Sequence, residues 1–414
     1  MTAREASVAA LGAFRRGEDY RAAIAKAPEG RERALANATV SAAIRNLALI
    51  DRRIGGASSV RTAKLEPLVL DILRSASAEL WFMDKIPDSA AVNEAVNLAK
   101  RRVPRASGFV NAVLRRLARG TAEEPDAPDG PARLSALYSH PEWYAGYLAE
   151  RFGTDAAERV LKADNTPPPI TCVANTARAS RAEVAAAIRA DGAEVSERAD
   201  CDALLDLSKP GDITKLAAFR AGLFYVQDAG AYRAAQSCGV KPGDTAVDLC
   251  AAPGGKSFAL ALAGAAKVLA FDLAPRVALI RDGARRLGLS AVDARAGDAD
   301  AYNETLAQTA DAVLCDVPCS GFGVIRRKPE IRFKTRESVA PLPETQLRIL
   351  RNGARYVKPG GRLVYSTCTL LREENEDVVR AFLKPGEKFR LKSEETLLPS
   401  DAGDGFYIAV IERM

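Results

Sequence analysis

The spacing of apolar residues changes along the chain and divides it into three segments. Over residues 1–120, apolar side chains recur three to four positions apart, as at Val92, Ala95 and Ala99, and β-branched runs are few. This spacing predicts a bundle of amphipathic helices. The next stretch, TAEEPDAPDGPA at 121–132, has no periodicity and is acidic and rich in proline and glycine. Such a composition predicts a linker.

The second segment, 133–230, begins with a helical pattern and then alternates between strand-like and helix-like stretches. In order these are ITCVANT, RAEVAAAIRADG, AEVSERA, DALLDLS, DITKLAAFRAG and LFYVQD. The resulting β-α-β-β-α-β order predicts a small α+β subdomain of the ferredoxin-like or RNA-recognition-like type. The segment lacks the aromatic run on which a single-strand RNA reader stacks bases. We therefore interpret it as an adaptor.

The third segment, 231–414, alternates short apolar runs with amphipathic helices such as RVALIRDGARRLGL and ETQLRILRNGARYV. The apolar runs are TAVDLCA, AKVLAFDL, VDARAGD, DAVLCDVP and GRLVYSTC. This alternation predicts an α/β domain with a doubly wound, mostly parallel sheet covered by helices on both faces. In such sheets ligands bind at the carboxyl ends of the strands.

Composition narrows the class of protein. A chain of 414 residues with 48% hydrophobic and 27% charged residues is typical of a soluble protein with more than one domain. No apolar run reaches the ~18 residues that a membrane span needs, and the N-terminus has no secretory apolar core. The seven cysteines show neither disulfide-framework nor zinc spacing, so we expect reduced thiols, a cytoplasmic location and no metal. His140, the single histidine, lies in SHPEW and gives no reason to expect a histidine-based triad.

Positive charge is concentrated at the N-terminal end. Residues 1–120 sum to +9, whereas the whole chain carries +6, so the remainder is −3. This asymmetry favours a polyanion-binding module, although a solvated face remains the simpler interpretation of any single arginine. The tract RRVPRASGFVNAVLRRLARG contains six arginines without an intervening acid, a density that predicts phosphate contacts. These are Arg101, Arg102, Arg105, Arg115, Arg116 and Arg119.

The first strand of the third segment runs into DLCAAPGGK. Gly254 and Gly255 allow a tight turn and a close approach of the backbone to a ligand, with a helix N-terminus following. The stretch is not a phosphate-binding P-loop, because Cys250 stands where that motif needs glycine. It does not match the GxGxxG pattern of dinucleotide sites either.

Acidic residues close the next three strands, at Asp272, Asp298 and Asp316. One such acid is often a helix cap or a turn residue. Three in succession beside a glycine turn favour a cofactor that carries a nucleoside. Asp272 follows the turn by about twenty positions, where an acid accepts hydrogen bonds from ribose hydroxyls.

Two cysteines are predicted on the same rim. Cys319 follows the fourth strand in DVPCSGFG, and Cys368 ends the fifth strand in YSTCTL. Cysteine is often only a small buried hydrophobe, which is our interpretation of the mid-strand Cys315. Two thiols at a cofactor rim instead indicate nucleophilic, covalent chemistry.

These motifs together resemble one family. DLCAAPGGK, DVPCSGFG followed by RRKPEIR, YSTCTL followed by EENED, and the terminal DGFYIAVIER resemble the Nol/Nop/Sun family of RNA cytosine-C5 methyltransferases. Residues 1–120 resemble a NusB-type helical RNA-binding domain. IPDSAAVNEAVNLAKR, GFVNAVLRRLAR and YSHPEW are similar to the RsmB branch, which acts on small-subunit ribosomal RNA. The resemblance covers essentially the whole chain and implies that 231–414 is a Rossmann-like class I methyltransferase domain.

The resemblance implies specific roles for the rim residues. Cys368 would be the nucleophile that adds to cytosine C6, and Cys319 would promote removal of the C5 proton and release of the product. Asp316 would bind the Watson–Crick edge of the base, and Lys256 would lie beside substrate or cofactor. The cofactor would be S-adenosylmethionine. Its contacts would be Cys250, Ala251, Ala252, Pro253, Gly254, Gly255, Lys256, Asp272, Asp298 and Asp316.

The expected partner is small-subunit rRNA, bound by a monomer. Besides the six N-terminal arginines, the basic loop after DVPC predicts phosphate contacts. Its members are Arg326, Arg327, Lys328 and Arg332. A solvated surface is the alternative interpretation of such a loop.

Three other functions compete with this one. A DNA cytosine-5 methyltransferase uses a Pro-Cys nucleophile like Pro318-Cys319, which would reverse the roles of the two thiols. A non-catalytic RNA-binding or antitermination factor would leave the aspartates and cysteines of the rim without a purpose. A protein or small-molecule methyltransferase would use the same cofactor turn but has no need of two thiols.

Overall fold

The computed structural model of the chain describes residues 1–120, 130–384 and 388–414. The predicted linker at 121–132 therefore lies largely outside the described residues, and its last two positions already belong to helix α8, Pro131–Tyr138. Within the described part of the chain, no helix is both long and apolar enough to span a membrane.

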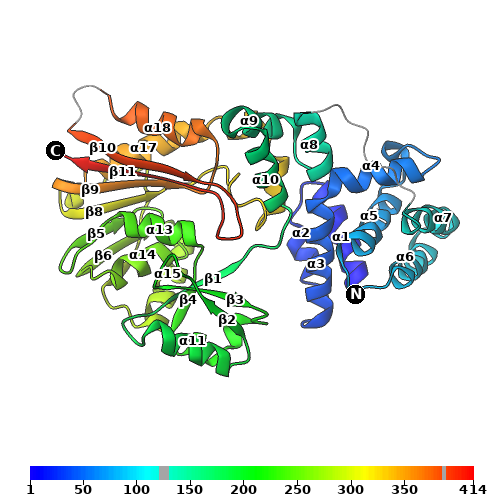
Figure 1. Cartoon of the computed structure of the whole chain (residues 1–414), viewed down its shortest axis with the longest axis horizontal. Coiled ribbons are helices and arrows are strands. Elements are labelled where there is room, and N and C mark those ends of the chain that lie inside the picture. The colour runs from blue at the N-terminus through cyan, green and yellow to red at the C-terminus, as the bar shows by residue number, and fades with distance from the viewer. Residues whose placement is uncertain (121–129, 385–387) are drawn as a thin grey trace. The chain divides into compact units, whose positions relative to one another are not determined.

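The described residues form two compact units (Figure 1). The first unit contains Met1–Thr166 together with a short segment from much later in the chain, Lys328–Phe333. The second unit contains Pro167–Arg327 and Lys334–Met414. The short segment forms a single 3-10 turn, η5, over Pro329–Phe333.

The first unit is helical, as the periodicity predicts. Its first helix begins with a capping box, in which the Thr2 hydroxyl accepts the N–H of Glu5 and the Glu5 carboxylate accepts the N–H of Thr2. Buried side chains such as Ile44, Ile54 and Leu114 form a common core. Its first seven helices are α1 Ala3–Arg15, α2 Tyr20–Ile24, α3 Arg31–Arg45, α4 Leu47–Ala57, α5 Pro67–Phe82, α6 Asp88–Arg102 and α7 Ser107–Ala118.

The two compact units divide the chain at a different point from the predicted segments. Helices α8, α9 (Glu142–Phe152) and α10 (Thr154–Ala163) belong to the first unit. The sequence interpretation placed this stretch at the start of the adaptor segment. The helices pack on one another through buried residues such as Leu148 and Leu161, so their apolar faces are satisfied without the sheet that follows.

The adaptor has the predicted β-α-β-β-α-β order. Its four strands pair antiparallel in the order β2-β3-β1-β4, and buried Val184 and Ile188 of α11 pack on the sheet. The elements are β1 Ile170–Ala174, α11 Arg181–Ala190, β2 Glu194–Glu197, β3 Leu204–Ser208, α12 Ala217–Arg220 and β4 Phe224–Val226.

The methyltransferase-like domain is built on a seven-stranded sheet in the order β10-β11-β9-β8-β5-β6-β7. The five predicted strands form its parallel part. They are β5 Thr245–Asp248, β6 Lys267–Asp272, β7 Val292–Ala296, β8 Ala310–Asp316 and β9 Val357–Thr367. The hairpin of β10 (Phe389–Leu397) and β11 (Phe406–Arg413) pairs antiparallel beside β9 and was not predicted as strand.

Helices cover both faces of this sheet (Figure 1). On one face α17 (Leu342–Ala354) and α18 (Glu376–Phe382) pack on a core that includes Cys315, which is buried as predicted. Helices α13 (Ala229–Ser237) and α14 (Gly255–Leu262) pack on the other face. A further helix, α15 (Ala274–Leu287), follows β6. The strand order reverses between β5 and β8, and parallel sheets of this kind bind ligands at the carboxyl ends on either side of such a point.

Candidate active site at the carboxyl ends of the parallel strands

The turn after β5 is shaped for close approach of a ligand. Gly254 has φ +115° and caps the N-terminus of α14. A Cβ at this position would lie 2.3 Å from Cζ of Phe258, so a side chain fits neither the conformation nor the space. Burial raises the pKa of the Cys250 thiol in the same turn well above its usual range, so this thiol is not a ready nucleophile.

Asp272, at the end of β6, holds the turn in place. One carboxylate oxygen accepts the N–H of Ala252 at 2.8 Å, and the other accepts the N–H of Leu273 at 2.8 Å. The side chain is 4% exposed. Each carboxylate oxygen can accept more than one hydrogen bond, so the residue still has acceptor capacity for hydroxyl groups.

A pocket of about 360 Å³ opens beyond the ends of β6 and β7. Its lining includes Leu249, Phe271, Asp298 and Tyr302. Asp298 is exposed, and one of its oxygens accepts the N–H of Asp300 at 2.9 Å. The pocket thus combines apolar walls at Leu249 and Phe271 with acids at Asp298 and Glu304.

Asp316 and Lys256 form an ion pair beside the turn. Lys256 Nζ lies 2.7 Å from one oxygen of Asp316, and the Ser366 hydroxyl donates to the other oxygen at 2.8 Å. Burial acts to lower the pKa of Lys256, but the Asp316 carboxylate outweighs it and the pKa is raised. The Cys368 sulfur acts on Lys256 in the same direction, so this ammonium lies within electrostatic reach of the thiol.

The two predicted thiols meet at the rim. Cys319 follows β8 by three residues, Cys368 directly follows β9, and their sulfur atoms are 3.2 Å apart. Both side chains are partly exposed. The hydrogen bond to Cys368 and then burial raise the pKa of Cys319 well above its usual range. Cys319 therefore holds its proton more firmly than an ordinary thiol does.

A buried carboxylate supports the loop that carries Cys319. Glu374 is 1% exposed and accepts hydrogen bonds from the Ser320 N–H and the Gln346 side-chain amide, each at 2.8 Å. Gln346 also donates to the carbonyl of Pro318 at 3.0 Å, and Lys334 donates to the carbonyl of Ser320 at 2.7 Å. The peptide groups on both sides of Cys319 are therefore held by hydrogen bonds to Gln346 and Glu374.

Two glycines let three backbone segments lie against one another beside the thiols. The Gly323 N–H donates to the carbonyl of Cys368 at 2.9 Å, and the Gly405 N–H donates to the carbonyl of Gly323 at 2.8 Å. A Cβ on Gly323 would lie 2.3 Å from the Gly405 carbonyl oxygen. Glycine at 323 is thus required by close backbone approach.

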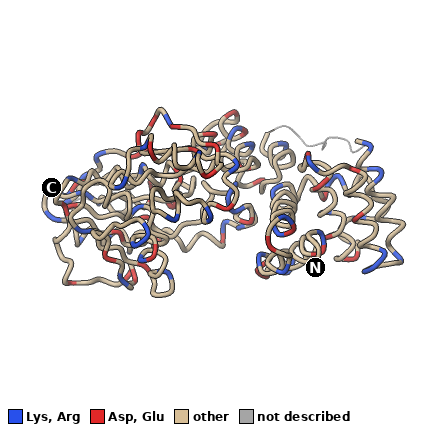
Figure 2. The backbone as a smooth tube through the Cα atoms, turned by 90° about the horizontal axis from the view of Figure 1, so that it is seen from below, with Lys and Arg blue, Asp and Glu red and all other residues tan. Residues whose placement is uncertain are grey.

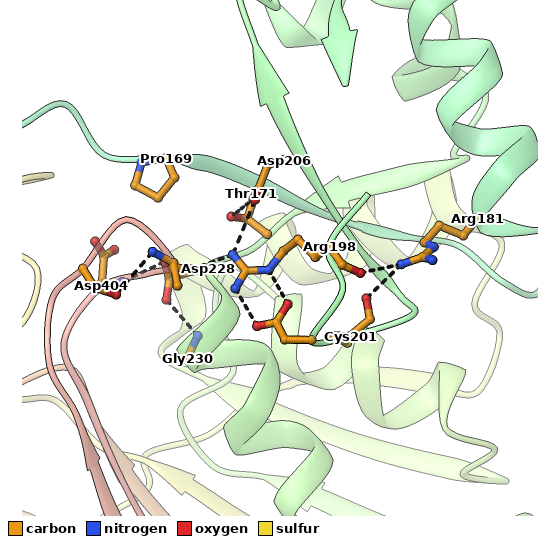
Figure 3. Close-up of polar contacts among 12 residues, drawn as sticks. Pro169, Thr171, Arg181, Arg198, Cys201, Asp206, Asp228, Gly230 and Asp404 are labelled. Carbon is orange, nitrogen blue, oxygen red and sulfur yellow. Dashed lines mark hydrogen bonds and ion pairs between the residues drawn. The ribbon is translucent and has the colours of Figure 1, made fainter. Parts of the chain in front are cut away.

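The structure contradicts the predicted RNA contact of Arg326, which is 1% exposed and pairs with Asp404 at 2.5 Å. Its neighbour Arg327 also pairs with Asp404, and with Asp228 at 3.1 Å. Figure 3 shows Asp404 and Asp228 close together, with Asp228 accepting the Gly230 N–H at the start of α13. These arginines fix the loop after DVPC to the β10–β11 hairpin, because two nearby carboxylates pair with them.

Arg332 is also buried, at 0% exposure, within the first unit. Its guanidinium donates to the carbonyls of Arg45 and Ser139 and to the Asn165 side chain. Burial lowers its pKa to about 9. The prediction of RNA contact is wrong for Arg332 in this environment, whereas Lys328 is exposed.

All six arginines of the N-terminal tract are exposed. Figure 2 shows Lys and Arg recurring along the helices of the first unit. Arg101 lies 3.4 Å from Glu5 at the surface, and Arg115 donates to Asn111 at 3.1 Å. Their side chains are accessible to a polyanion, and their contact with RNA stays a prediction.

His140 lies in the packing of the first unit. It is 3% exposed, its Nδ1 is 2.7 Å from the carbonyl of Tyr138, and its Nε2 is 3.5 Å from Asp164. Burial, with Arg332 adding to it, lowers the pKa of His140 well below its usual value. A neutral, enclosed imidazole of this kind serves packing. In the described ranges no group of three His, Cys, Asp or Glu residues is arranged to hold a metal.

Sequence reasoning missed the support beneath the rim. Glu374 was quoted only as part of the EENED stretch, and Gln346 lies in a helix whose pattern marks it as one polar position among several. Gly323 and Gly405 are in motifs that were quoted, but the contact between them joins segments far apart in the chain. No local signal marks such a contact.

Comparisons with known proteins agree with this geometry. The family model described as 16S rRNA methyltransferase RsmB/F matches residues 236–411. The NusB family model matches residues 1–119, and the RsmF/B-like ferredoxin-like domain matches residues 140–214. The three matches follow one another along the chain in the order of the three predicted segments.

Curated relatives and solved structures give the same result. The chain is 39% identical over 333 residues to the probable ribosomal RNA small subunit methyltransferase B of Bacillus subtilis, covering 79% of this chain and 74% of that protein. It is 34% identical to ribosomal RNA small subunit methyltransferase B of Vibrio cholerae, over 81% and 79% of the two chains. The crystal structure of PH0851 matches with TM-score 0.80 and 27% identity over 99% and 98%. A methyltransferase homologue from Pyrococcus horikoshii matches with TM-score 0.60 and 26% identity over 68% and 98%. The chain therefore belongs to the ribosomal RNA small subunit methyltransferase B family.

Proposed function

We propose that the chain methylates carbon 5 of a cytosine in small-subunit rRNA, with S-adenosylmethionine as methyl donor and a transient bond between Cys368 and the base. The observation that carries this proposal is the 3.2 Å approach of two thiols at a strand rim that also carries the Asp316–Lys256 pair and the glycine turn. Cofactor binding accounts for the glycine turn after β5, and covalent chemistry accounts for the two thiols, Cys319 and Cys368.

The residues present fit S-adenosylmethionine. Its ribose would be held by Asp272, its adenine would lie in the pocket beside Asp298, and the turn around Gly254 would admit the rest. When bound, it supplies a methyl group made electrophilic by a sulfonium. A relative in fold, NSun6 from Pyrococcus horikoshii, was solved with SFG, an analogue of this donor, and matches with TM-score 0.58 at 20% identity. That match supports the fold.

Ionisation of Cys368 is the first task of the site. Thiolate is the nucleophile, and a neighbouring cation favours it. Lys256 is such a cation, and the Cys319 S–H can donate a hydrogen bond to the thiolate. The single histidine is not needed, because the acceptor of the nucleophile is the base itself.

The covalent step then divides one difficult reaction into easier ones. The Cys368 sulfur forms a bond to C6, and the C5–C6 π electrons make C5 nucleophilic toward the methyl group. Asp316 would bind the Watson–Crick edge of the base near N3. Once the Cys368 sulfur is bonded to C6, it no longer carries the charge that raised the pKa of Cys319. Cys319 can then ionise and accept the C5 proton. The C5–C6 double bond re-forms, and the Cys368 sulfur leaves.

The substrate base must leave its stack to reach both thiols, at a cost of a few kcal/mol that is smallest for an unpaired base. Phosphate contacts from the exposed N-terminal arginines and Lys328 would offset part of this cost. We propose further that the enzyme acts as a cytoplasmic monomer without a metal. Sedimentation of the protein without RNA tests the monomer, since a coefficient that rises with concentration contradicts it.

Trapping on RNA tests the assigned roles. Cys319→Ala and Cys368→Ala are incubated with small-subunit rRNA and S-adenosylmethionine and run on a denaturing gel. Cys319→Ala is expected to accumulate a protein–RNA adduct, whereas Cys368→Ala gives neither adduct nor 5-methylcytosine. Cys201→Ala, at a partly exposed thiol of the adaptor, is the matched control and keeps full activity. The reverse pattern makes Cys319 the nucleophile, as in the DNA enzymes.

A further inference from the structure

A groove of about 550 Å³ lies on the methyltransferase domain away from the thiols. Its cations come from four places in the fold: Arg351 in α17, Arg355 just after α17, Lys388 just before β10, and Arg413 at the end of β11. We call these four residues and the aromatic side chains of Tyr302 and Phe389 between them the basic groove. None of the described residues that line it is acidic.

The cations of the basic groove lie near the start of β9, at the opposite end of that strand from Cys368, and the groove shares Tyr302 with the pocket beside Asp298. Arg355 and Arg413 are next to Val357, where β9 begins, and the Arg413 guanidinium donates to the Val357 carbonyl. Cys368 follows the other end of that strand. Strand β8 alone has 7 residues, which at ~3.3 Å per residue separates the two ends by about 20 Å.

Within the described ranges, which leave out 385–387, no acidic partner compensates the charges of the basic groove. Among the described residues, Arg351, Arg355 and Lys388 make no ion pair. Two other exposed arginines of the same domain are paired: Arg380 with Asp377 at 2.9 Å and Arg390 with Glu412 at 3.2 Å. Basic residues at a helix C-terminus also stabilise the helix dipole. That explanation covers Arg351 and Arg355 but leaves Lys388 and Arg413, which come from strand ends.

Aromatic rings lie among these cations. The guanidinium carbon of Arg355 lies 3.2 Å from the centroid of the Tyr302 ring, and Tyr302 stacks on Tyr356 with an interplanar angle of 8°. Cations without acids bind phosphates, and the exposed guanidinium of Arg355 offers a plane on which a base can stack. An acidic protein would match the charge but has no use for a stacking face.

We infer that the basic groove binds a strand of the substrate rRNA at a distance from the methylated base. The inference rests on the proposed function for the identity of the RNA. A stacked strand rises ~3.4 Å per nucleotide, so about 20 Å corresponds to roughly six nucleotides. The groove therefore contacts nucleotides about six or more positions from the target, and a shorter substrate cannot reach it.

The test measures RNA binding by the full chain as a function of salt, with two RNAs. The long RNA is a small-subunit rRNA fragment with at least fifteen nucleotides on each side of the target, and the short RNA keeps three. The variant is Arg351→Gln/Arg355→Gln. The control is Arg380→Gln/Arg390→Gln, which removes two exposed arginines of the same domain that already have acidic partners.

Each lost phosphate contact lowers the slope of log K against log salt by ~0.7 for a single strand, so the variant is expected to lose about 1.4 on the long RNA. Its affinity for the short RNA, and the control on either RNA, should be unchanged. Equal slopes for variant and wild type on the long RNA overturn the inference, as does an equal loss on both RNAs. Loss of polyglutamate binding without loss of RNA binding assigns the groove to an acidic protein and also overturns it.

Failure of the proposed function is recognised separately. Methylation of the short RNA by the wild-type chain depends on the thiols and not on the basic groove. A wild type that binds the long RNA but methylates neither RNA contradicts the proposed function, whatever the slopes show. Normal methylation with equal slopes contradicts only the groove.

Discussion

Replacing Gly323 by alanine should disable the candidate active site while leaving the cofactor turn intact. The added Cβ would lie 2.3 Å from the Gly405 carbonyl oxygen and 2.9 Å from the Cys368 carbonyl oxygen. Both neighbours are backbone atoms, which cannot rotate away as a flexible side chain can. The segment that carries Cys319 must therefore move away from the segment that carries Cys368.

The size of the effect follows from what that movement breaks. The hydrogen bonds of Gly323 with Cys368 and Gly405 contribute ~1 kcal/mol each, and overpacking a close contact costs typically ~1–3 kcal/mol. Together these give about 3–5 kcal/mol. If 3 kcal/mol of this is lost from the aligned transition state, kcat/KM falls roughly a hundredfold, at ~1.4 kcal/mol for each factor of ten.

Transfer of a labelled methyl group to small-subunit rRNA measures this loss, and binding of a cofactor analogue checks that the turn is unaffected. The matched control is Gly403→Ala in the nearby hairpin loop, where the new Cβ meets its nearest neighbour, the Ala229 Cβ, at an ordinary 3.6 Å. The control should keep its activity. Full activity and an unchanged melting temperature for Gly323→Ala would refute the reasoning.

Three further predictions concern charge. Burial raises the pKa of Asp248 to about 7, so between about pH 4 and 7 the folded chain holds a proton that the unfolded chain has released, and stability falls as pH rises through this range. The melting temperature of Asp248→Asn should therefore fall less between pH 5 and pH 8 than that of the wild type. Equal falls in the two melting temperatures would contradict this. Glu374→Gln removes a charge that raises the pKa of Cys319, so alkylation of this thiol should begin at lower pH than in the wild type, and an unshifted profile would exclude the effect. Lys256→Met removes the cation near Cys368, so alkylation of Cys368 should begin at higher pH and adduct formation should slow; unchanged rates at pH 7 would remove Lys256 from the mechanism.

The rim of the sheet could be predicted from the sequence because its geometry is regular. Asp272, Asp316 and Cys368 each close an apolar run, and parallel strands bring such ends to one edge whatever the details of packing. The 3.2 Å approach of the two sulfurs then needs only that β8 and β9 be neighbours, which they are.

What could not be predicted depends on partners distant in sequence. The sequence alone does not distinguish Arg326 from Arg101, but Arg326 pairs with Asp404 in the interior and Arg101 lies at the surface. The hairpin β10–β11 was missed because β11 reads FYIAVIER, an apolar run that periodicity alone does not assign to strand or helix. Its pairing with β9 settles the choice.

The segment Lys328–Phe333 makes the chain difficult to divide. It belongs to the first unit, although it lies in the middle of the methyltransferase sequence, only nine residues after Cys319. If the N-terminal domain is exchanged between relatives, in evolution or in the laboratory, this six-residue segment of the methyltransferase sequence must be exchanged with it. A swap at Thr166 alone would join a foreign helical unit to a segment whose Arg332 is fitted to the original Arg45, Ser139 and Asn165. The helical unit and this internal segment can therefore change only together.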